Sequence, residues 1–255
     1  MGEGDEAMQT RGSLPIGRRG YLSLFGIGLM GVSMSRAQAA EAKGRAPATT
    51  SSDDEEIDRV RISNLILRER TARDAARWDE MRASYHPDST VDISWFKGKG
   101  PAFVDATAEL FTKRLRSFHQ LEPPVVTINN DRALVDVGAA VHLPGFVGDV
   151  AVGVISHTRA LYRVERSAGR WSISHLTSIY VRDSMHTVIP GAALKLDVDK
   201  LMAFREPYRF LSYLLAQSGY PPNNILPGID RQDLVDSIYD QNTRWLDQAA
   251  RRESP

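Results

Sequence analysis

Apolar residues recur at helical spacing where the folded part of the chain begins. They are Ile57, Val60, Ile62, Leu65 and Ile66. This spacing predicts a helix over residues 55–75. A short second helix is predicted around Trp78, ended by residues 86–88 (HPD), and a third over residues 101–116. The folded part is therefore expected to open with three helices.

The pattern then changes to alternation of apolar and polar residues, which is typical of half-buried strands. Strands are predicted over residues 90–96, 125–128, 133–143, 150–165 and 171–181. The turns are marked by Gly98 and Gly100, residues 129–131 (NND), Pro144-Gly145 and residues 167–169 (SAG). Three helices followed by long antiparallel strands indicate an α+β fold with the helices on one face of the sheet. A strongly curved sheet of this kind wraps around a helix and leaves a cone-like cavity.

Two more helices are predicted after the last strand, over residues 199–218 and 232–251, with residues 219–222 (GYPP) as the break between them. Their apolar residues recur at helical spacing, which indicates packing rather than a ligand site. We predict that they belong to a C-terminal helical extension over residues 190–255. This extension is expected to pack on the domain or across a homodimer interface, and it could also cover the mouth of a pocket.

The N-terminal segment follows a different pattern. Arg18 and Arg19 precede a short apolar run over residues 22–34, and Ala37-Gln38-Ala39 has the small-x-small pattern of a signal-peptidase site. The run is too short to cross a bilayer, which takes ~20 residues. Two arginines before an aromatic residue and Leu are typical of a twin-arginine signal. We therefore expect residues 1–39 to be an export signal to the periplasm or the medium, and residues 40–54 a flexible linker. The alternatives are an uncleaved anchor and a fortuitously basic N-terminus.

Composition narrows the classes of function. The 32 basic and 32 acidic residues give a formal net charge of zero, whereas nucleic acids and anionic membranes attract proteins with a concentrated positive field. The count of cysteines is 0, which excludes disulfides, thiolate nucleophiles and Cys-ligated metal sites. We expect no nucleic-acid partner, no stable membrane span after removal of the signal, and no metal or organic cofactor.

Several short strings resemble one superfamily in their order and spacing. They are residues 73–79 (RDAARWD), 91–95 (VDISW), 169–173 (GRWSI) and 179–183 (IYVRD). Together they resemble the SnoaL-like branch of the NTF2-like superfamily. The resemblance implies a domain over residues 55–189, in which a curved antiparallel sheet forms a cone around the N-terminal helices. This superfamily includes cofactor-free dehydratases as well as non-catalytic modules, so the fold alone leaves the function open.

The resemblance to the dehydratase branch implies a catalytic pair. In that branch an Asp near the end of the first helix pairs with a His before the second strand, and the matching residues are Asp74 and His119. A His in a pocket can take a proton from a carbon next to a carbonyl group, while a carboxylate fixes its tautomer and stabilises the imidazolium. Loss of water or halide from the neighbouring carbon then completes an elimination. The structural alternatives are that Asp74 caps a turn and that His119 lies on the surface at a helix C-terminus.

The resemblance also implies two further site residues. His142 matches a second polar pocket group near a strand end, although it could lie at the rim. Asp136, on the same strand, is the alternative candidate for this polar group. Arg182 matches an Arg that would anchor a carboxylate or carbonyl, although a surface pair with Asp183 is the alternative. Two mid-strand histidines are expected at half-exposed sheet positions: His157 and His175.

One position departs from the family pattern. The Tyr or Lys that usually precedes the catalytic Asp by five residues is Glu69 here, and Glu donates a hydrogen bond only when it is protonated. Because Arg68 and Arg70 flank it, we interpret this stretch as charged helix surface. The pair of Asp74 and His119 still predicts a dehydratase or isomerase acting on a mid-sized, apolar, oxygenated small molecule. The alternative is a module that binds such a ligand, or dimerises, without catalysis.

Overall fold

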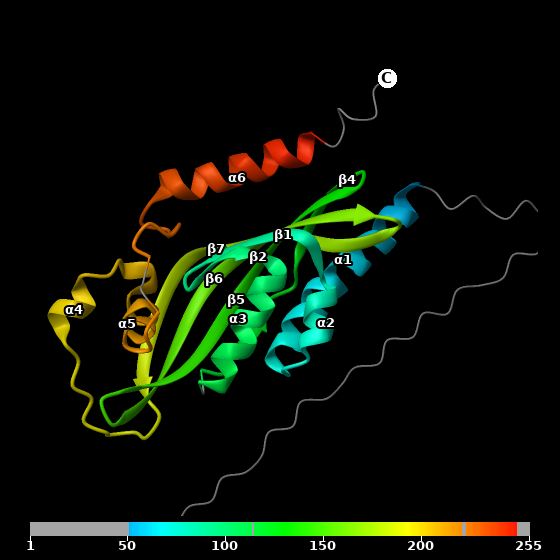
Figure 1. Ribbon diagram of the computed structural model, residues 1–255. Coiled ribbons are helices and arrows are strands. Elements are labelled where there is room, and N and C mark those ends of the chain that lie inside the picture. The colour runs from blue at the N-terminus through cyan, green and yellow to red at the C-terminus, as the bar shows by residue number, and fades with distance from the viewer. Residues whose placement is uncertain (1–50, 114, 221–222, 249–255) are drawn as a thin grey trace, which may run out of the picture. The chain divides into compact units, whose positions relative to one another are not determined.

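The computed structural model describes residues 51–113, 115–220 and 223–248. The predicted export signal and residues 40–50 of the predicted linker lie outside these ranges. The described chain forms an α+β domain with N-terminal helices, a curved sheet and C-terminal helices, as the sequence predicts (Figure 1).

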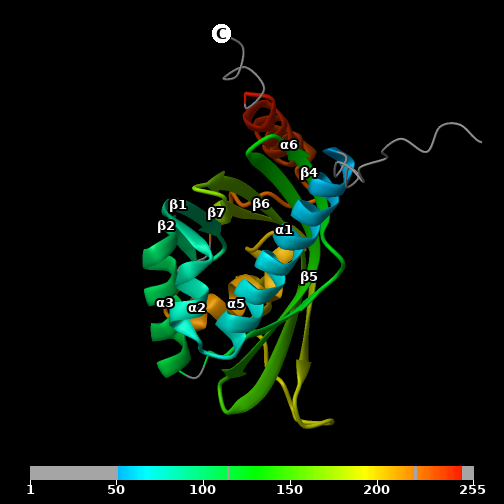
Figure 2. The same cartoon turned by 90° about the vertical axis from the view of Figure 1, so that its right-hand side faces the viewer.

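Three helices open the domain, close to their predicted positions: α1 (Ser51–Asp74), α2 (Trp78–Ala83) and α3 (Gly100–Thr112). Ile62 and Ile66 on α1 are both 0% exposed and belong to a core shared with the sheet. Ile57 and Val60 are instead 44% and 60% exposed, so the helical spacing marks the buried face of α1 only from Ile62 onward. Figure 2 shows α1, α2 and α3 together on one side of the sheet.

The sheet has seven strands. They are β1 (Tyr85–Ile93), β2 (Phe96–Lys99), β3 (Phe118–Leu121), β4 (Val125–Asn129), β5 (Arg132–Val147), β6 (Val150–Ser167) and β7 (Arg170–Thr187). The order is β2-β1-β7-β6-β5-β3, and β4 pairs with another part of β5. Neighbours pair antiparallel, except that β1 runs parallel to β7.

Several strands extend further than the sequence predicts. β1 already begins at Tyr85, so residues 86–88 continue into a strand, with a register irregularity in its pairing to β7 that accommodates Pro87. β5 continues through Pro144-Gly145, which was predicted to close it. Beyond His142 the strand β3 no longer pairs with β5, and a proline is tolerated along such an edge. Strand β3, which carries His119, was not predicted.

The first C-terminal helix was predicted as one segment over residues 199–218, and this prediction is wrong. The structure has α4 (Val198–Met202), a 3₁₀ turn η1 (Glu206–Tyr208) and α5 (Arg209–Gln217). Pro207 lies at the start of η1, and because proline lacks an N–H group it interrupts a continuous helix.

The C-terminal helices cover two different parts of the sheet. Helix α5 packs Leu214 and Leu215 against the far ends of β5, β6 and β7. A Cβ atom at Gly145 would lie 2.6 Å from the Leu214 side chain, so glycine lets Leu214 pack closely against β5. Helix α6 (Gln232–Asp247) lies on the face opposite α1, where Val235 packs on Leu161 of β6 (Figure 1).

Candidate active site

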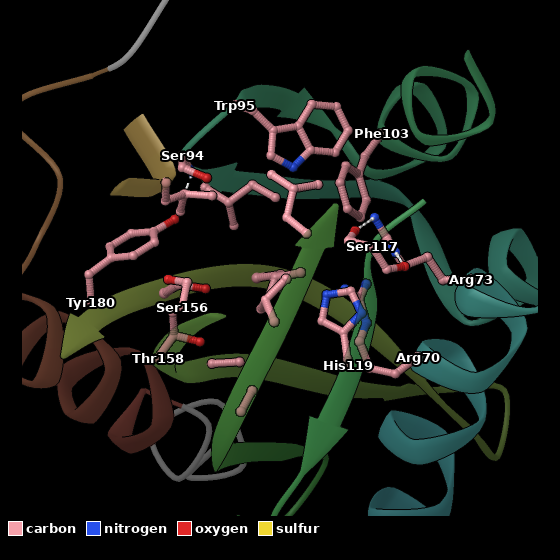
Figure 3. A pocket seen from close by; sticks show the side chains of 18 of the residues that line it. Arg70, Arg73, Ser94, Trp95, Phe103, Ser117, His119, Ser156, Thr158 and Tyr180 are labelled. Atoms are coloured by element: carbon pink, nitrogen blue, oxygen red, sulfur yellow. Dashed lines mark hydrogen bonds between the residues drawn. The ribbon is translucent and has the colours of Figure 1, made fainter. Parts of the chain in front are cut away.

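Asp74 and His119 lie in direct contact. Asp74 ends α1, and His119 lies in β3, the strand beside the helix end. The Asp74 Oδ2 atom accepts a hydrogen bond of 2.7 Å from the backbone N–H of His119, and Oδ1 lies 2.9 Å from the ring atom Nδ1. A carboxylate only accepts hydrogen bonds, so Nδ1 carries the proton and Nε2 has a free lone pair. The ring of His119 lines a cavity (Figure 3).

Arg73 supports this pair from the last turn of α1. Its Nη1 atom donates to Asp74 Oδ1 at 2.9 Å and to the Ser117 carbonyl at 2.8 Å, and its Nη2 atom donates to Ser117 Oγ at 2.8 Å. Its side chain is 3% exposed, so these bonds hold the carboxylate in a largely dry setting (Figure 3). Within the described residues the Nε–H group of Arg73 has no partner.

Glu69 is buried rather than part of a charged surface. It is 0% exposed, forms an ion pair with Arg70, and accepts a hydrogen bond of 2.9 Å from the Tyr85 hydroxyl. The interpretation of this stretch as helix surface is therefore wrong. Glu69 contacts Tyr85, while its partner Arg70 lines the same cavity as Arg73 and His119.

The surroundings favour a neutral imidazole. Burial, together with the positive charge of Arg73, lowers the pKa of His119 to about 3 despite the opposing effect of Asp74. Burial alone would raise the pKa of Asp74, but the hydrogen bond from His119 and the charge of Arg73 outweigh it, and the pKa is lowered. At neutral pH the pair is therefore a carboxylate with a neutral histidine, which leaves Nε2 able to accept a proton.

The cavity is apolar in its middle and polar at two ends. Its apolar lining includes Trp95, Phe103, Val141, Leu143 and Leu176. Two side chains of α5, Leu211 and Leu215, close one side, so the C-terminal extension does contribute to the pocket. The volume of about 90 Å³ is below the ~150 Å³ of an engineered cavity that binds benzene. A mid-sized ligand therefore requires side chains at the cavity wall to move.

His142 does not line the cavity, so the structure contradicts its predicted position in the pocket. Side chains along a strand alternate between faces, and Val141 and Leu143 occupy the cavity face of β5. The ring of His142 stacks on Phe118 with 4.3 Å between the ring centroids, and its Nε2 atom lies 2.9 Å from Gln120 Oε1.

Arg182 also lies outside the cavity. The register of β7 against β6 shifts by one residue at Val181, because Tyr180 pairs with Thr158 and Arg182 with His157. This bulge turns Arg182 to the exposed side of the sheet. Its neighbour Asp183 faces α5 and accepts a hydrogen bond of 2.7 Å from the Leu211 N–H group.

The remaining candidates lie on the outer face of the sheet. Asp136 alternates with the cavity-lining residues of β5 and forms an ion pair with Arg159 at 2.8 Å. His175 Nδ1 lies 2.8 Å from Thr90 Oγ1, and His157 is half-buried, as expected for a mid-strand position.

Sequence reasoning missed the other polar groups that line the cavity beside His119. They are Arg70, Arg73, Ser94, Ser117, Ser156, Thr158, Ser178 and Tyr180. Two signals were available: Arg73 precedes Asp74, and Ser156 alternates with half-buried residues along β6 in phase with Thr158 and Ala160. Alternation identifies a shared face, but it does not say whether that face meets a helix or a cavity.

Two kinds of feature are missing from the described residues. In these ranges no three His, Asp or Glu side chains come together in a way that could hold a metal ion. Nor does any described helix combine the length and apolar character needed to cross a membrane.

Comparison with known proteins identifies relatives of the domain. Residues 54–177 match the family described as the SnoaL-like domain. A PEP2-like protein of Fusarium vanettenii is 24% identical over an alignment of 209 positions that covers 74% of this chain and 88% of that protein. Pea pathogenicity protein 2 of the same fungus is 24% identical over 160 residues, 62% of this chain and 69% of that protein.

Similar solved structures include a hexachlorocyclohexane dehydrochlorinase from Novosphingobium barchaimii. It is 15% identical, with a TM-score of 0.48, and the match covers 57% of this chain and 99% of that one. A protein of Novosphingobium aromaticivorans, provisionally identified as a scytalone dehydratase, is 15% identical with a TM-score of 0.45, covering 57% and 97% of the two chains.

Proposed function

We propose that the cavity of this domain, whose residues 54–177 match the SnoaL-like domain, is the active site of a cofactor-independent dehydratase or isomerase. The substrate is a small, apolar molecule with a carbonyl or hydroxyl oxygen. The observation that carries the proposal is the 2.9 Å contact between Asp74 Oδ1 and His119 Nδ1 beside an apolar cavity.

His119 acts as the general base. Its Nε2 atom takes a proton from a carbon next to the substrate carbonyl, and the electrons of the C–H bond move into an enolate. The Asp74 carboxylate stabilises the imidazolium. In a dehydration, the enolate expels hydroxide from the neighbouring carbon, a C=C bond forms, and the proton on His119 converts the hydroxide to water. In an isomerisation the same proton returns to a different carbon.

Arg73 is suited to stabilise the enolate. Its unpartnered Nε–H is a hydrogen-bond donor beside the cavity, and buried donors aimed at developing charge contribute strongly to catalysis. The same positive charge lowers the pKa of His119. When an enolate forms next to the imidazolium, its negative charge favours the protonated ring, so His119 becomes a stronger base during the reaction.

Turnover of β-hydroxyketones tests this proposal. Loss of water yields an enone, whose ultraviolet absorbance reports the rate for a panel of cyclic and aryl β-hydroxyketones. We expect His119→Gln to lower kcat at least about 100-fold, because a general base contributes about 10²–10⁴-fold. His142→Gln is the matched control, since this histidine lies outside the cavity, and it should keep wild-type turnover. Equal rates for wild type and His119→Gln would remove the base role.

A binding module is the second candidate. The observation that favours it is the pKa of His119, lowered to about 3 by burial, which makes the ring a weak base. In this case the same ketones would bind without turnover, and His119→Gln would change their affinity only. The two candidates are therefore distinguished by titrating the protein with the ketones that give no product and measuring their affinity for wild type and His119→Gln.

A homodimer remains a prediction from the sequence.

We also propose that the protein is exported. The support is the order of Arg18-Arg19, the apolar run over residues 22–34 and the Ala37-Gln38-Ala39 site. Export by the twin-arginine route carries a folded protein, which suits a chain that has no disulfide to form.

A further inference from the structure

The cavity has a second group of polar side chains, away from Asp74 and His119. Ser156 and Thr158 on β6 and Ser178 and Tyr180 on β7 all line it. Figure 3 shows Ser94, Ser156, Thr158 and Tyr180 gathered on one side of the cavity, with Arg73, Ser117 and His119 on the other side. The proposed reaction does not use this group.

Ser156 is the unusual member of this group. It is 0% exposed, and its Oγ atom has no hydrogen-bond partner within the described residues. An unpaired buried hydroxyl destabilises a folded protein. Alanine occupies the comparable inward position Ala160 on the same strand, so the fold does not require a hydroxyl there. A ligand that bonds to Ser156 would account for the unpaired group.

Tyr180 offers a second donor. Its hydroxyl oxygen accepts a hydrogen bond of 2.8 Å from the Ser94 N–H group, and the Ser94 side chain lies beside it, so its own proton can turn toward a ligand in the cavity. Burial raises the pKa of Tyr180 to about 12, so the proton stays on the oxygen at neutral pH. Tyr180 pairs with Thr158, two residues along β6 from Ser156 and on the same face of the sheet.

The strand register fixes how far this group lies from the base. His119 pairs with Val141, and Val141 pairs with Ser156, so the three residues form one row across β3, β5 and β6. Two strand spacings separate the ends of the row, which is about 10 Å between backbones. The apolar side chain of Val141 lies between them. A single ring reaches both ends once side chains at the cavity wall move, because the volume of about 90 Å³ is below that of a cavity that binds benzene.

We propose that Ser156 and Tyr180 form an oxygen-binding subsite that orients the ligand against His119. The ligand it selects is a ring with a hydroxyl or carbonyl oxygen on the side opposite the carbon that faces His119. This inference rests on the proposed function in one respect, that the cavity binds a small molecule. It does not require turnover, so the subsite serves a binding module equally well.

Phenol and benzene are suitable probes, since they differ by one hydroxyl group. Their affinities are measured by NMR titration of the purified protein. We expect the wild type to bind phenol about tenfold more tightly than benzene. Ser156→Ala should reduce this ratio of affinities to about twofold, because it removes one hydrogen bond to the phenol hydroxyl. Ser89→Ala is the matched control. Ser89 is a second unpaired, buried serine hydroxyl, but it lies outside the cavity lining, so its removal should keep the tenfold preference.

Thermal unfolding gives an independent readout. Removing an unpaired hydroxyl should leave the Tm of Ser156→Ala unchanged or raise it by about 2–4 °C. A clear decrease in Tm would mean that the hydroxyl has a structural partner, and this would overturn the proposal. A wild type without preference for phenol, or one that binds neither probe, overturns it as well.

These results separate the subsite from the catalytic proposal. His119→Gln should lower kcat at least about 100-fold and keep the phenol preference, whereas Ser156→Ala should reduce the phenol preference. If His119 is not a base, turnover fails while the phenol preference in the wild type remains.

Discussion

The neutral state of His119 predicts a pH-dependent difference in stability between the wild type and His119→Gln. Its pKa is lowered from 6.5 to about 3 by burial. Between these values the unfolded chain binds a proton that the folded chain does not, so stability falls as the pH falls through this window. The side chain is 9% exposed, which leaves little screening by solvent.

The magnitude follows from the two pKa values. At pH 5 the unfolded histidine is almost fully protonated and the folded one is not, so the step from pH 7.5 to pH 5 costs about 2 kcal/mol of unfolding free energy. Glutamine keeps an N–H donor toward Asp74 but does not titrate. Contributions of other groups, such as Asp183 with its pKa raised to about 6 by burial, are common to both proteins and cancel in the comparison.

Urea unfolding at both pH values, followed by tryptophan fluorescence, measures the difference. We expect the wild type to lose about 2 kcal/mol more than His119→Gln between pH 7.5 and pH 5. His86→Gln, which removes a half-buried ring from β1, is the control and should behave as the wild type does. The same pH dependence in wild type and His119→Gln would refute the reasoning, because it would mean that His119 is protonated as readily in the folded chain as in the unfolded one.

Three further predictions address the core, the cavity wall and the N-terminus. Glu69→Gln leaves Arg70 buried without its counter-ion and should lower the unfolding free energy by about 3–5 kcal/mol in a urea titration; a loss below 1 kcal/mol would contradict the buried pair. Leu215→Ala should cost about 2–5 kcal/mol and enlarge the cavity, so that benzene binds more tightly in an NMR titration; unchanged affinity would show that Leu215 does not restrict the cavity. In a host with twin-arginine export, intact mass should show a chain that begins at Ala40, and replacement of both Arg18 and Arg19 by Lys should block export. An uncleaved or cytoplasmic wild-type chain would count against the signal.

The long elements could be predicted from the sequence because each has one buried face. The spacing of Ile62 and Ile66 identified α1, and alternation identified most of β5, β6 and β7. The predicted element bounds were wrong where a local sequence signal, such as a proline, conflicts with the pairing of strands that are distant in the sequence. Pro144 suggests a strand end, but β5 continues along an unpaired edge. The four-residue strand β3 is too short for a periodic signal and owes its conformation to β5.

The site was only partly predictable for a related reason. Asp74 and His119 were brought together by family resemblance, and their contact depends on the end of α1 meeting the unpredicted strand β3. The face of His142 follows from alternation with Val141 and Leu143, but the face of Arg182 depends on a bulge at Val181 that no local pattern marks. Burial of Glu69 depends on Tyr85, a partner from another element.

The most direct test of the account is the exchange of protons on carbon. Cyclopentanone in D₂O exchanges the hydrogens next to its carbonyl slowly, and NMR follows their loss with no need for a leaving group or a known substrate. If His119 is a base held by Asp74 beside the cavity, the wild type accelerates this exchange, and His119→Gln reduces the acceleration at least about 100-fold. Exchange that is no faster than in buffer, or equally fast with His119→Gln, would contradict the central claim.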